Sequence, residues 1–223
     1  VEEVEGIIEA WTDNRLNTGE VVNPDQAYLK FDNWRSVVHV PTFRNSLKNP
    51  NENINNFAQH YAARYMLILD GPSRIGLIAE QNRGDLKDPK STFAKLLTDD
   101  VRRQSLRDVL FDAFGLYLGM DISEGASIHL RYGNTAPPNE RTVEDPTLQW
   151  MRDARPIDQW SDGMKAFTGM LLVLRAGDPK IMIIDEPEAF LHPTLAYKLG
   201  REIAQTASQG NEQVFVSTHS SQF

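Results

Sequence analysis

Two acidic side chains and one imidazole near the end of the chain could do chemistry together. Asp185 and Glu186 directly follow the apolar run 181–184, and His219 comes shortly after the apolar run 214–216. One carboxylate could hold Mg²⁺ through water, and the next could orient and deprotonate an attacking water molecule. Taken singly, Asp185 is more readily explained as a loop cap and His219 as a surface histidine. Their order along the chain favours a shared site.

The elements that would position these side chains are two strands with a helix between them. The continuous apolar run 181–184 is typical of a strand covered on both faces. Pro193 suits the first turn of a helix, and Gly210 ends it. The buried stripe of that helix is Leu195, Leu199 and Ile203. With the strand 214–216, this order predicts a βαβ unit of a parallel sheet, and the residues that follow its two strands should meet at one edge.

A third segment offers an anion site at the start of a helix. Residues 163–174 are apolar nearly all round, which predicts a buried helix. Ser161 and Gly163 stand at its beginning, where backbone N–H groups and the positive end of the helix dipole attract anions. Glycine lacks a Cβ, so a phosphate can approach Gly163 closely. Both residues are therefore candidate phosphate contacts.

Four segments resemble motifs of the ABC-type ATPases. Residues 181–187 (IMIIDEP) resemble the Walker B motif, residues 160–165 (WSDGMK) resemble the signature motif, and residues 217–220 (STHS) resemble the switch-histidine segment. Residues 190–193 (FLHP) fall where that family has its D-loop, with His192 at the usual aspartate position. The combination is most similar to the bacterial AAA-type ATP-binding proteins that are related to the OLD and SMC ATPases.

The resemblance implies a fold, cofactors and roles for six residues. The fold would be an α/β P-loop NTPase of ABC-ATPase type, a mainly parallel sheet with flanking helices, incomplete here and carrying an α+β insert. ATP and Mg²⁺ would be the cofactors, and the protein would hydrolyse ATP as a nucleotide-bound homodimer that drives a partner activity. The implied roles are catalysis for Glu186 and His219, nucleotide binding for Ser161, Gly163 and His192, and metal binding for Asp185.

The P-loop of such an enzyme does not occur in the sequence. Gly71 and Gly76 have the right separation, but Leu77 and Ile78 replace the lysine and the hydroxyl residue of G-x-x-x-x-G-K-[ST]. The segment 70–74 (DGPSR) between two apolar runs instead predicts a hairpin turn. We therefore expect the P-loop upstream of these residues in the intact protein.

The sequence before the signature segment is less specific. We expect an insert or N-terminal mixed α/β part at 1–147 and an ATPase core at 148–223, divided by a proline-containing surface loop at 133–147. Predicted strands are 36–40 and 128–132, and one helix should end near Arg64. A short N-terminal helix is predicted from Val4, Ile7, Ile8 and Trp11. A longer helix from Asp99 has the apolar stripe Leu106, Val109, Leu110, Ala113, Phe114 and Tyr117.

Composition excludes several classes of protein. The chain has 223 residues, 40% of them hydrophobic, and a net charge of −8, which argues against a uniformly basic nucleic-acid surface. Cysteine is absent, so disulfides and thiolate zinc sites are excluded, and a reducing, cytoplasmic location is expected. No apolar run approaches the roughly 18 residues that cross a bilayer, so no membrane partner is expected.

Other functions remain open on the sequence alone. ATP could merely hold subunits together in a non-hydrolysing sensor or scaffold, although Glu186 favours hydrolysis because a sensor needs no base there. A nuclease centre would need a further acidic cluster, and Glu188 with His192 could suggest zinc, but the neighbouring prolines break any helix carrying both. DNA or a nuclease-like effector module is the expected partner class. A helix face could contact DNA phosphates through Arg102, Arg103 and Arg107, although a solvated face explains these better.

Overall fold

The computed structural model describes residues 8–11, 26–31, 34–39, 41–42, 45, 48–49, 66–176, 179–209, 212–221 and 223. The chain divides into two compact units, residues 1–64 and residues 65–223. Every residue to which the sequence assigns a role in the site lies in the second unit.

The first unit contains an antiparallel sheet. Its strands are β1 (Ile8–Trp11), β2 (Gln26–Phe31) and β3 (Trp34–His39), in the order β1-β2-β3. β3 confirms the strand predicted at 36–40. The predicted N-terminal helix is wrong at Ile8–Trp11, because β1 pairs with β2 along its length and that pairing overrides a helical spacing of only four apolar residues. The helix expected to end near Arg64 lies outside the described residues.

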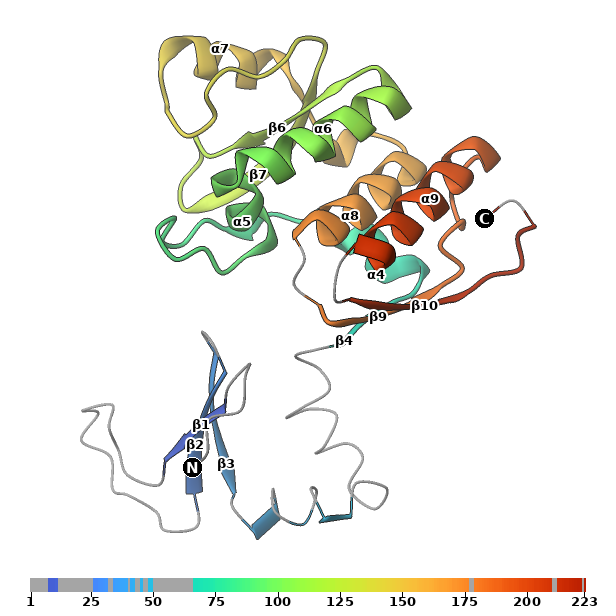
Figure 1. The fold of residues 1–223 in the computed structure, drawn as a ribbon. Coiled ribbons are helices and arrows are strands. Elements are labelled where there is room, and N and C mark those ends of the chain that lie inside the picture. The colour runs from blue at the N-terminus through green and yellow to red at the C-terminus, as the bar shows by residue number, and fades with distance from the viewer. Residues whose placement is uncertain are drawn as a thin grey trace. The chain divides into compact units, whose positions relative to one another are not determined.

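The second unit is built on a parallel sheet. The strands β4 (Met66–Leu69), β9 (Ile181–Asp185) and β10 (Gln213–Ser217) lie in the order β10-β9-β4, and β9 pairs in parallel with both neighbours. The helix α9 (Pro193–Gln209) joins β9 to β10, which confirms the predicted βαβ unit. Figure 1 shows α9 and α8 (Asp162–Ala176) over the same face of this sheet. The predicted α/β class is thus confirmed.

The sheet is not equally covered on its two faces. Met182 and Ile184 of β9 are buried, whereas Ile181 and Ile183, which alternate with them, are only partly buried. The apolar run predicted a strand covered on both faces. Within the part of the chain that the structure describes, β9 is fully buried only on the face that carries Met182 and Ile184.

The segment after β4 corrects a prediction. A hairpin was expected at 70–74, but β4 is followed by the short helix α4 (Gly71–Gly76). Asp70 caps this helix: its Oδ1 accepts a hydrogen bond from Ser73 N at 2.9 Å, and Asp70 N donates to Ser73 Oγ at 2.8 Å. Asp, Gly, Pro and Ser serve both turns and helix starts. The local residues could not reveal that β4 pairs with a strand more than a hundred residues away.

Helix α8 is the centre of the second unit. It packs against α4, α5 (Thr92–Thr98), α6 (Asp100–Phe114) and α9, and its burial confirms the prediction made for 163–174. The helix expected from Asp99 is α6, and Asp99 Oδ1 accepts from Arg102 N as its cap. Gly115, with a φ of 66°, ends α6. Tyr117 was predicted on the same stripe but lies in the next strand.

A second sheet, which is antiparallel, packs against α6 through β6 (Tyr117–Asp121). It contains β5 (Gln81–Asn82), β6, β7 (Ser127–Gly133) and β8 (Arg155–Pro156), and β7 confirms the strand predicted at 128–132. The loop after β7 gives way to α7 (Asp145–Asp153), and the 3-10 turn Ile157–Gln159 leads to α8.

One hydrophobic cluster runs through the second unit. Leu69, Phe93, Leu106, Phe167 and Met182 are buried in it. These residues lie on both sides of the predicted boundary between 147 and 148, and β4, from before that boundary, pairs with β9. The structure therefore does not separate residues 65–147 from residues 148–223. The division into an insert and an ATPase core stays a prediction. None of the helices in the described part of the chain combines the length and apolarity needed to cross a membrane.

Candidate functional site

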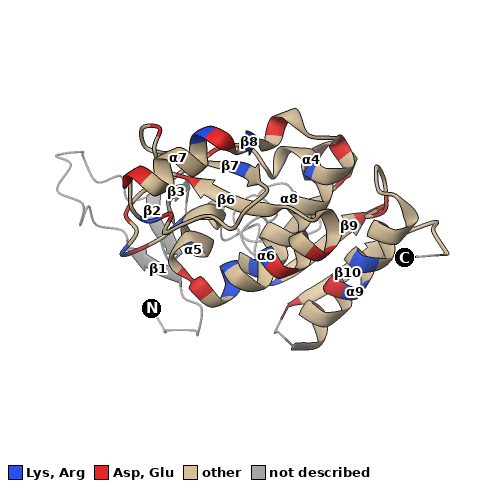
Figure 2. Cartoon of the chain, turned by 90° about the horizontal axis from the view of Figure 1, so that it is seen from above, with Lys and Arg blue, Asp and Glu red and all other residues tan. Residues whose placement is uncertain are grey.

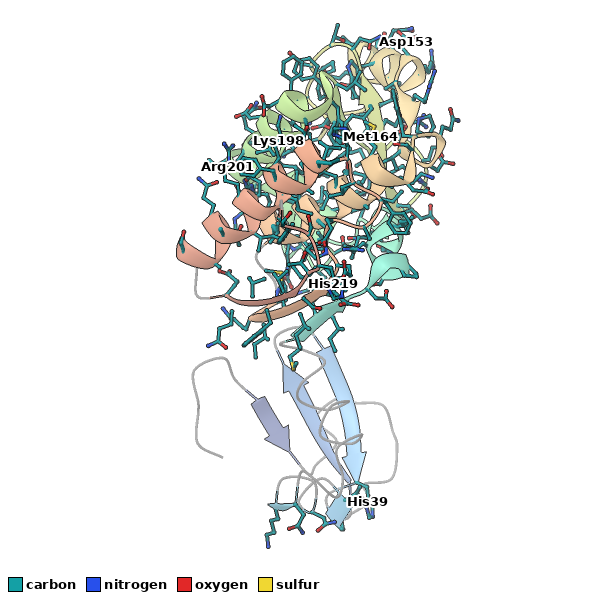
Figure 3. The ribbon with its side chains drawn as sticks, turned by 90° about the vertical axis from the view of Figure 1, so that its right-hand side faces the viewer. His39, Asp153, Met164, Lys198, Arg201 and His219 are labelled. Atoms are coloured by element: carbon teal, nitrogen blue, oxygen red, sulfur yellow. The ribbon has the colours of Figure 1, made fainter. Side chains whose placement is uncertain are left out.

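The predicted site lies where β9 and β10 end. Ser217 is paired with Asp185, so the residues that follow the two strands start level with each other. His219 Nε2 lies 3.3 Å from Glu186 Oε1. The side chain of His219, which Figure 3 labels, is 92% exposed and that of Glu186 is 33% exposed, so both are accessible to solvent. The structure therefore brings the two candidate catalytic residues into contact.

Glu186 has a strained backbone. Its φ is 50°, in the left-handed region that costs a residue with a Cβ roughly 1–2 kcal/mol. Its N–H donates to Ser217 O at 2.7 Å, and its carbonyl accepts from Ala189 N at 2.8 Å and from Arg74 Nη1 at 2.5 Å. Contacts from outside β9 thus hold Glu186 in this conformation, and strain of this kind gathers at functional sites.

Glu188 connects the loop after β9 to the segment after β10. Its Oε1 accepts hydrogen bonds from Thr218 Oγ1 at 2.5 Å and from Ser220 N at 3.1 Å. Burial raises the pKa of Glu188, but these hydrogen bonds outweigh burial and hold the pKa below its ordinary value. The charged carboxylate therefore fixes the residues on either side of His219. The sequence suggested only a zinc ligand here. The position of Glu188, two residues after Glu186, could have indicated that it lies in the same site.

Arg74 is the residue of the site that the sequence missed. Its side chain is fully buried, and burial lowers the pKa of Arg74 while the carboxylates of Glu188, Asp185, Asp70 and Glu186 oppose that shift. The predicted hairpin placed Arg74 in an exposed turn. The parallel pairing of β4 with β9 brings it instead to the rim. Only a correct strand order could have found it.

The signature segment begins α8 as predicted. Ser161 caps the helix, because its Oγ accepts from Met164 N at 3.3 Å and its carbonyl accepts from Lys165 N at 3.0 Å. A Cβ on Gly163 would lie 2.5 Å from Phe190 O. The missing Cβ thus lets α8 approach the loop after β9, a packing reason for glycine that the sequence did not predict. Contact of Ser161 or Gly163 with a phosphate remains a prediction.

His192 begins α9. Its carbonyl accepts from Leu195 N at 2.8 Å and Ala196 N at 3.0 Å, and its Nδ1 accepts from Thr194 N at 3.4 Å. The residue at the D-loop aspartate position is thus a helix cap in this chain. A role for His192 in nucleotide binding remains a prediction.

The donor set at the rim suits one kind of metal. Among the residues that the structure describes, no three His, Asp or Glu side chains gather to hold an ion, so the zinc interpretation of Glu188 and His192 gains no support. Asp185 is an exposed carboxylate at the end of β9. Mg²⁺ keeps several water ligands and takes one or two carboxylates together with substrate phosphates. Asp185 fits that ion.

The arginines of α6 are engaged within the fold. Arg102 Nη1 donates to Ala176 O at 2.8 Å, and Arg103 and Arg107 both pair with the buried Glu140. Figure 2 shows that α6 carries charges of both signs. The interpretation of these arginines as a DNA-contacting face therefore gains no support.

Comparison with known proteins gives the family. Residues 30–223 match the family described as "AAA domain, putative AbiEii toxin, Type IV TA system". The search of curated proteins found no match. Among solved structures, the chain is similar to the SMC head in a crystal structure of that head bound to the C-winged helix domain of ScpA. The identity is 13% and the TM-score 0.51, over 89% of this chain and 58% of that one. The chain belongs to this AAA family and is an ATPase-type nucleotide-binding domain with the fold of the SMC head.

Proposed function

We propose that the chain is the catalytic portion of an ABC-like ATPase, which dimerises around ATP and uses hydrolysis to drive a partner activity. The observation that supports this most is the contact between Glu186 and His219 at the carboxyl edge of a parallel sheet. A carboxylate and an imidazole there could serve two parts of one reaction, the attacking water and the γ-phosphate that it attacks.

Each rim residue has a proposed role. Asp185 holds Mg²⁺, which when bound neutralises charge on the β- and γ-phosphates. Glu186 orients the attacking water and accepts its proton. His219 donates a hydrogen bond to the γ-phosphate and so registers its loss. Glu188 keeps the His219 segment in place through Thr218 and Ser220.

The remaining site residues are proposed to act between subunits. Ser161 and Gly163 begin α8 and would bind the γ-phosphate held by the partner subunit, through backbone N–H groups and the helix dipole. His192 would lie beside that nucleotide. The pattern G-x-x-x-x-G-K-[ST] does not occur in these 223 residues, so we propose that another segment of the intact protein supplies the P-loop. DNA or a nuclease-like effector is the proposed target of the activity.

The experiment compares two glutamate variants of the intact protein. Glu186→Gln keeps the shape of the side chain but cannot accept a proton, so ATP turnover should fall on the order of 10²-fold or more. ATP binding should persist, and the ATP-bound dimer should live longer. Glu144→Gln is the matched control, because Glu144 is exposed at the start of α7 and its side chain caps nothing. Parental turnover by Glu186→Gln would contradict the proposal, and dimerisation without turnover in the parental protein would support the sensor instead.

A further inference from the structure

A buried arginine from a distant element holds the backbone of Glu186. Arg74 lies on α4, 112 positions earlier in the chain, and its Nη1 donates to Glu186 O at 2.5 Å. On the other side, Glu186 N donates to Ser217 O at the end of β10. The left-handed residue is thus held at both of its peptide groups, by β10 at its N–H and by Arg74 of α4, together with Ala189 N, at its carbonyl.

Burying the guanidinium of Arg74 costs free energy unless its charge makes favourable interactions. The side chain is 0% exposed, and its Nε and Nη2 have no hydrogen-bond partner in the described part of the chain. An apolar side chain would fill the same space without the desolvation penalty of a buried guanidinium. What an apolar side chain could not provide is the charged donor to Glu186 O, together with the attraction of the carboxylates around it.

Helix α4, which carries Arg74, is itself held in place by its neighbours. A Cβ on Gly169 of α8 would lie 2.7 Å from Arg74 O, so the backbone of α4 rests directly on α8. A Cβ on Gly71 would lie 3.4 Å from the ring of Phe190, a residue of the loop after β9. Helix α4 therefore touches both the signature helix and the loop that contains Glu186.

We propose that Arg74 is a positioning residue, which keeps Glu186 in its left-handed conformation and thereby aims the carboxylate at the rim beside His219. The catalytic consequence rests on the function proposed above, whereas the effect on the backbone does not. The cost of a left-handed residue and the worth of a hydrogen bond from a charged donor are of the same order. Without Arg74, Glu186 relaxes toward a negative φ, which turns its side chain away.

The test uses the intact protein and three variants. Arg74→Met removes the hydrogen-bond donor but keeps most of the side-chain volume. Arg74→Lys keeps the positive charge but lacks the planar guanidinium group. Arg102→Met is the control, since Arg102 also donates to a backbone carbonyl. In Arg74→Met, amide hydrogen exchange in the peptide 185–192 should rise about tenfold or more. Its kcat should fall at least about tenfold, while the Kd for ATP stays within about threefold. Arg74→Lys should lie between, and Arg102→Met should match the parent.

A double variant separates positioning from mere structural support. If Arg74 acts through Glu186, adding Arg74→Met to Glu186→Gln should lower turnover by no more than about twofold further. Parental exchange in Arg74→Met, or a full additional loss in the double variant, would overturn the inference. If the parental protein hydrolyses no ATP, the proposed function fails, but the exchange measurement still decides the role of Arg74. Should Arg74→Met fail to fold, Arg74→Lys supplies the same comparison.

Discussion

At the scale of single residues, two neighbouring glutamates are held in different ways. The side chain of Glu186 is partly exposed and touches His219, while its backbone is fixed from both sides. The side chain of Glu188 is fixed by Thr218 and Ser220. The carboxylate of Glu186 is thus accessible, and that of Glu188 holds the segment around His219 in place. This division is what the proposed role of Glu186 as a general base requires, because a base must be held in position to accept a proton.

Asp121, which lies outside the site, allows the contribution of a buried charge to stability to be tested by changing the pH. Burial raises the pKa of Asp121, but hydrogen bonds from Ser123 and Arg131 outweigh it and hold the pKa below its ordinary value. A depressed pKa in the folded state adds stability above the ordinary pKa of about 4, which is lost as pH falls through the folded-state value. Asp121→Asn should cost on the order of 2 kcal/mol at pH 7.

Urea unfolding of the parent and of Asp121→Asn at several pH values checks this expectation. The difference in unfolding free energy should shrink below pH 4, where the parental carboxylate also gains a proton. A difference that stays constant from pH 7 to pH 3 would show that the charge of Asp121 contributes nothing.

At the scale of elements, the sequence predicted those whose signal is local and missed those that depend on a distant partner. The apolar runs of β9 and β10 and the stripe of α9 follow from residues close together in the chain. β4 was placed in a hairpin because Asp70 and Pro72 suit a turn as well as a helix start. The sequence therefore predicted that the residues at the ends of β9 and β10 meet at one edge, but not that Arg74 reaches this edge through β4.

The approach of α8 to the loop after β9 gives a prediction at the scale of elements. Alanine is a better helix former than glycine by about 1 kcal/mol, so Gly163→Ala would stabilise an isolated α8. In the protein, the new Cβ would lie 2.5 Å from Phe190 O, a backbone atom that cannot move alone. Gly163→Ala should therefore destabilise the fold by about 1–3 kcal/mol, as overpacking does.

Thermal unfolding of two variants measures this effect. Gly76→Ala is the matched control, because a Cβ at Gly76 meets nothing within 4 Å. The control should unfold at the parental temperature or slightly above it, and Gly163→Ala several degrees below it. Equal unfolding temperatures for the two variants would mean that α8 and the loop are not in close contact.

At the scale of the whole molecule, the chain matches 58% of the SMC head to which it is similar. Its 223 residues include candidates for the Walker B, signature, D-loop and switch-histidine motifs, but no G-x-x-x-x-G-K-[ST] pattern. Catalysis of phosphoryl transfer is mostly positioning and charge stabilisation, and the P-loop supplies the main phosphate cradle. Residues 1–223 alone should therefore show no measurable ATP turnover and at best weak nucleotide binding. Calorimetric titration with Mg-ATP would contradict this by giving micromolar affinity.

The most direct test of the proposed two-subunit ATPase mixes two inactive variants of the intact protein. Ser161→Arg would fill the proposed anion site at the start of α8. It should spare ATP binding by a monomer, but abolish dimerisation and turnover of the variant alone. Glu186→Gln lacks the base. In a mixed dimer, one composite site receives both lesions and the other receives neither. We predict that ATP hydrolysis returns on mixing; complete inactivity of mixed dimers, shown to have assembled by light scattering, would contradict a signature that acts across the dimer.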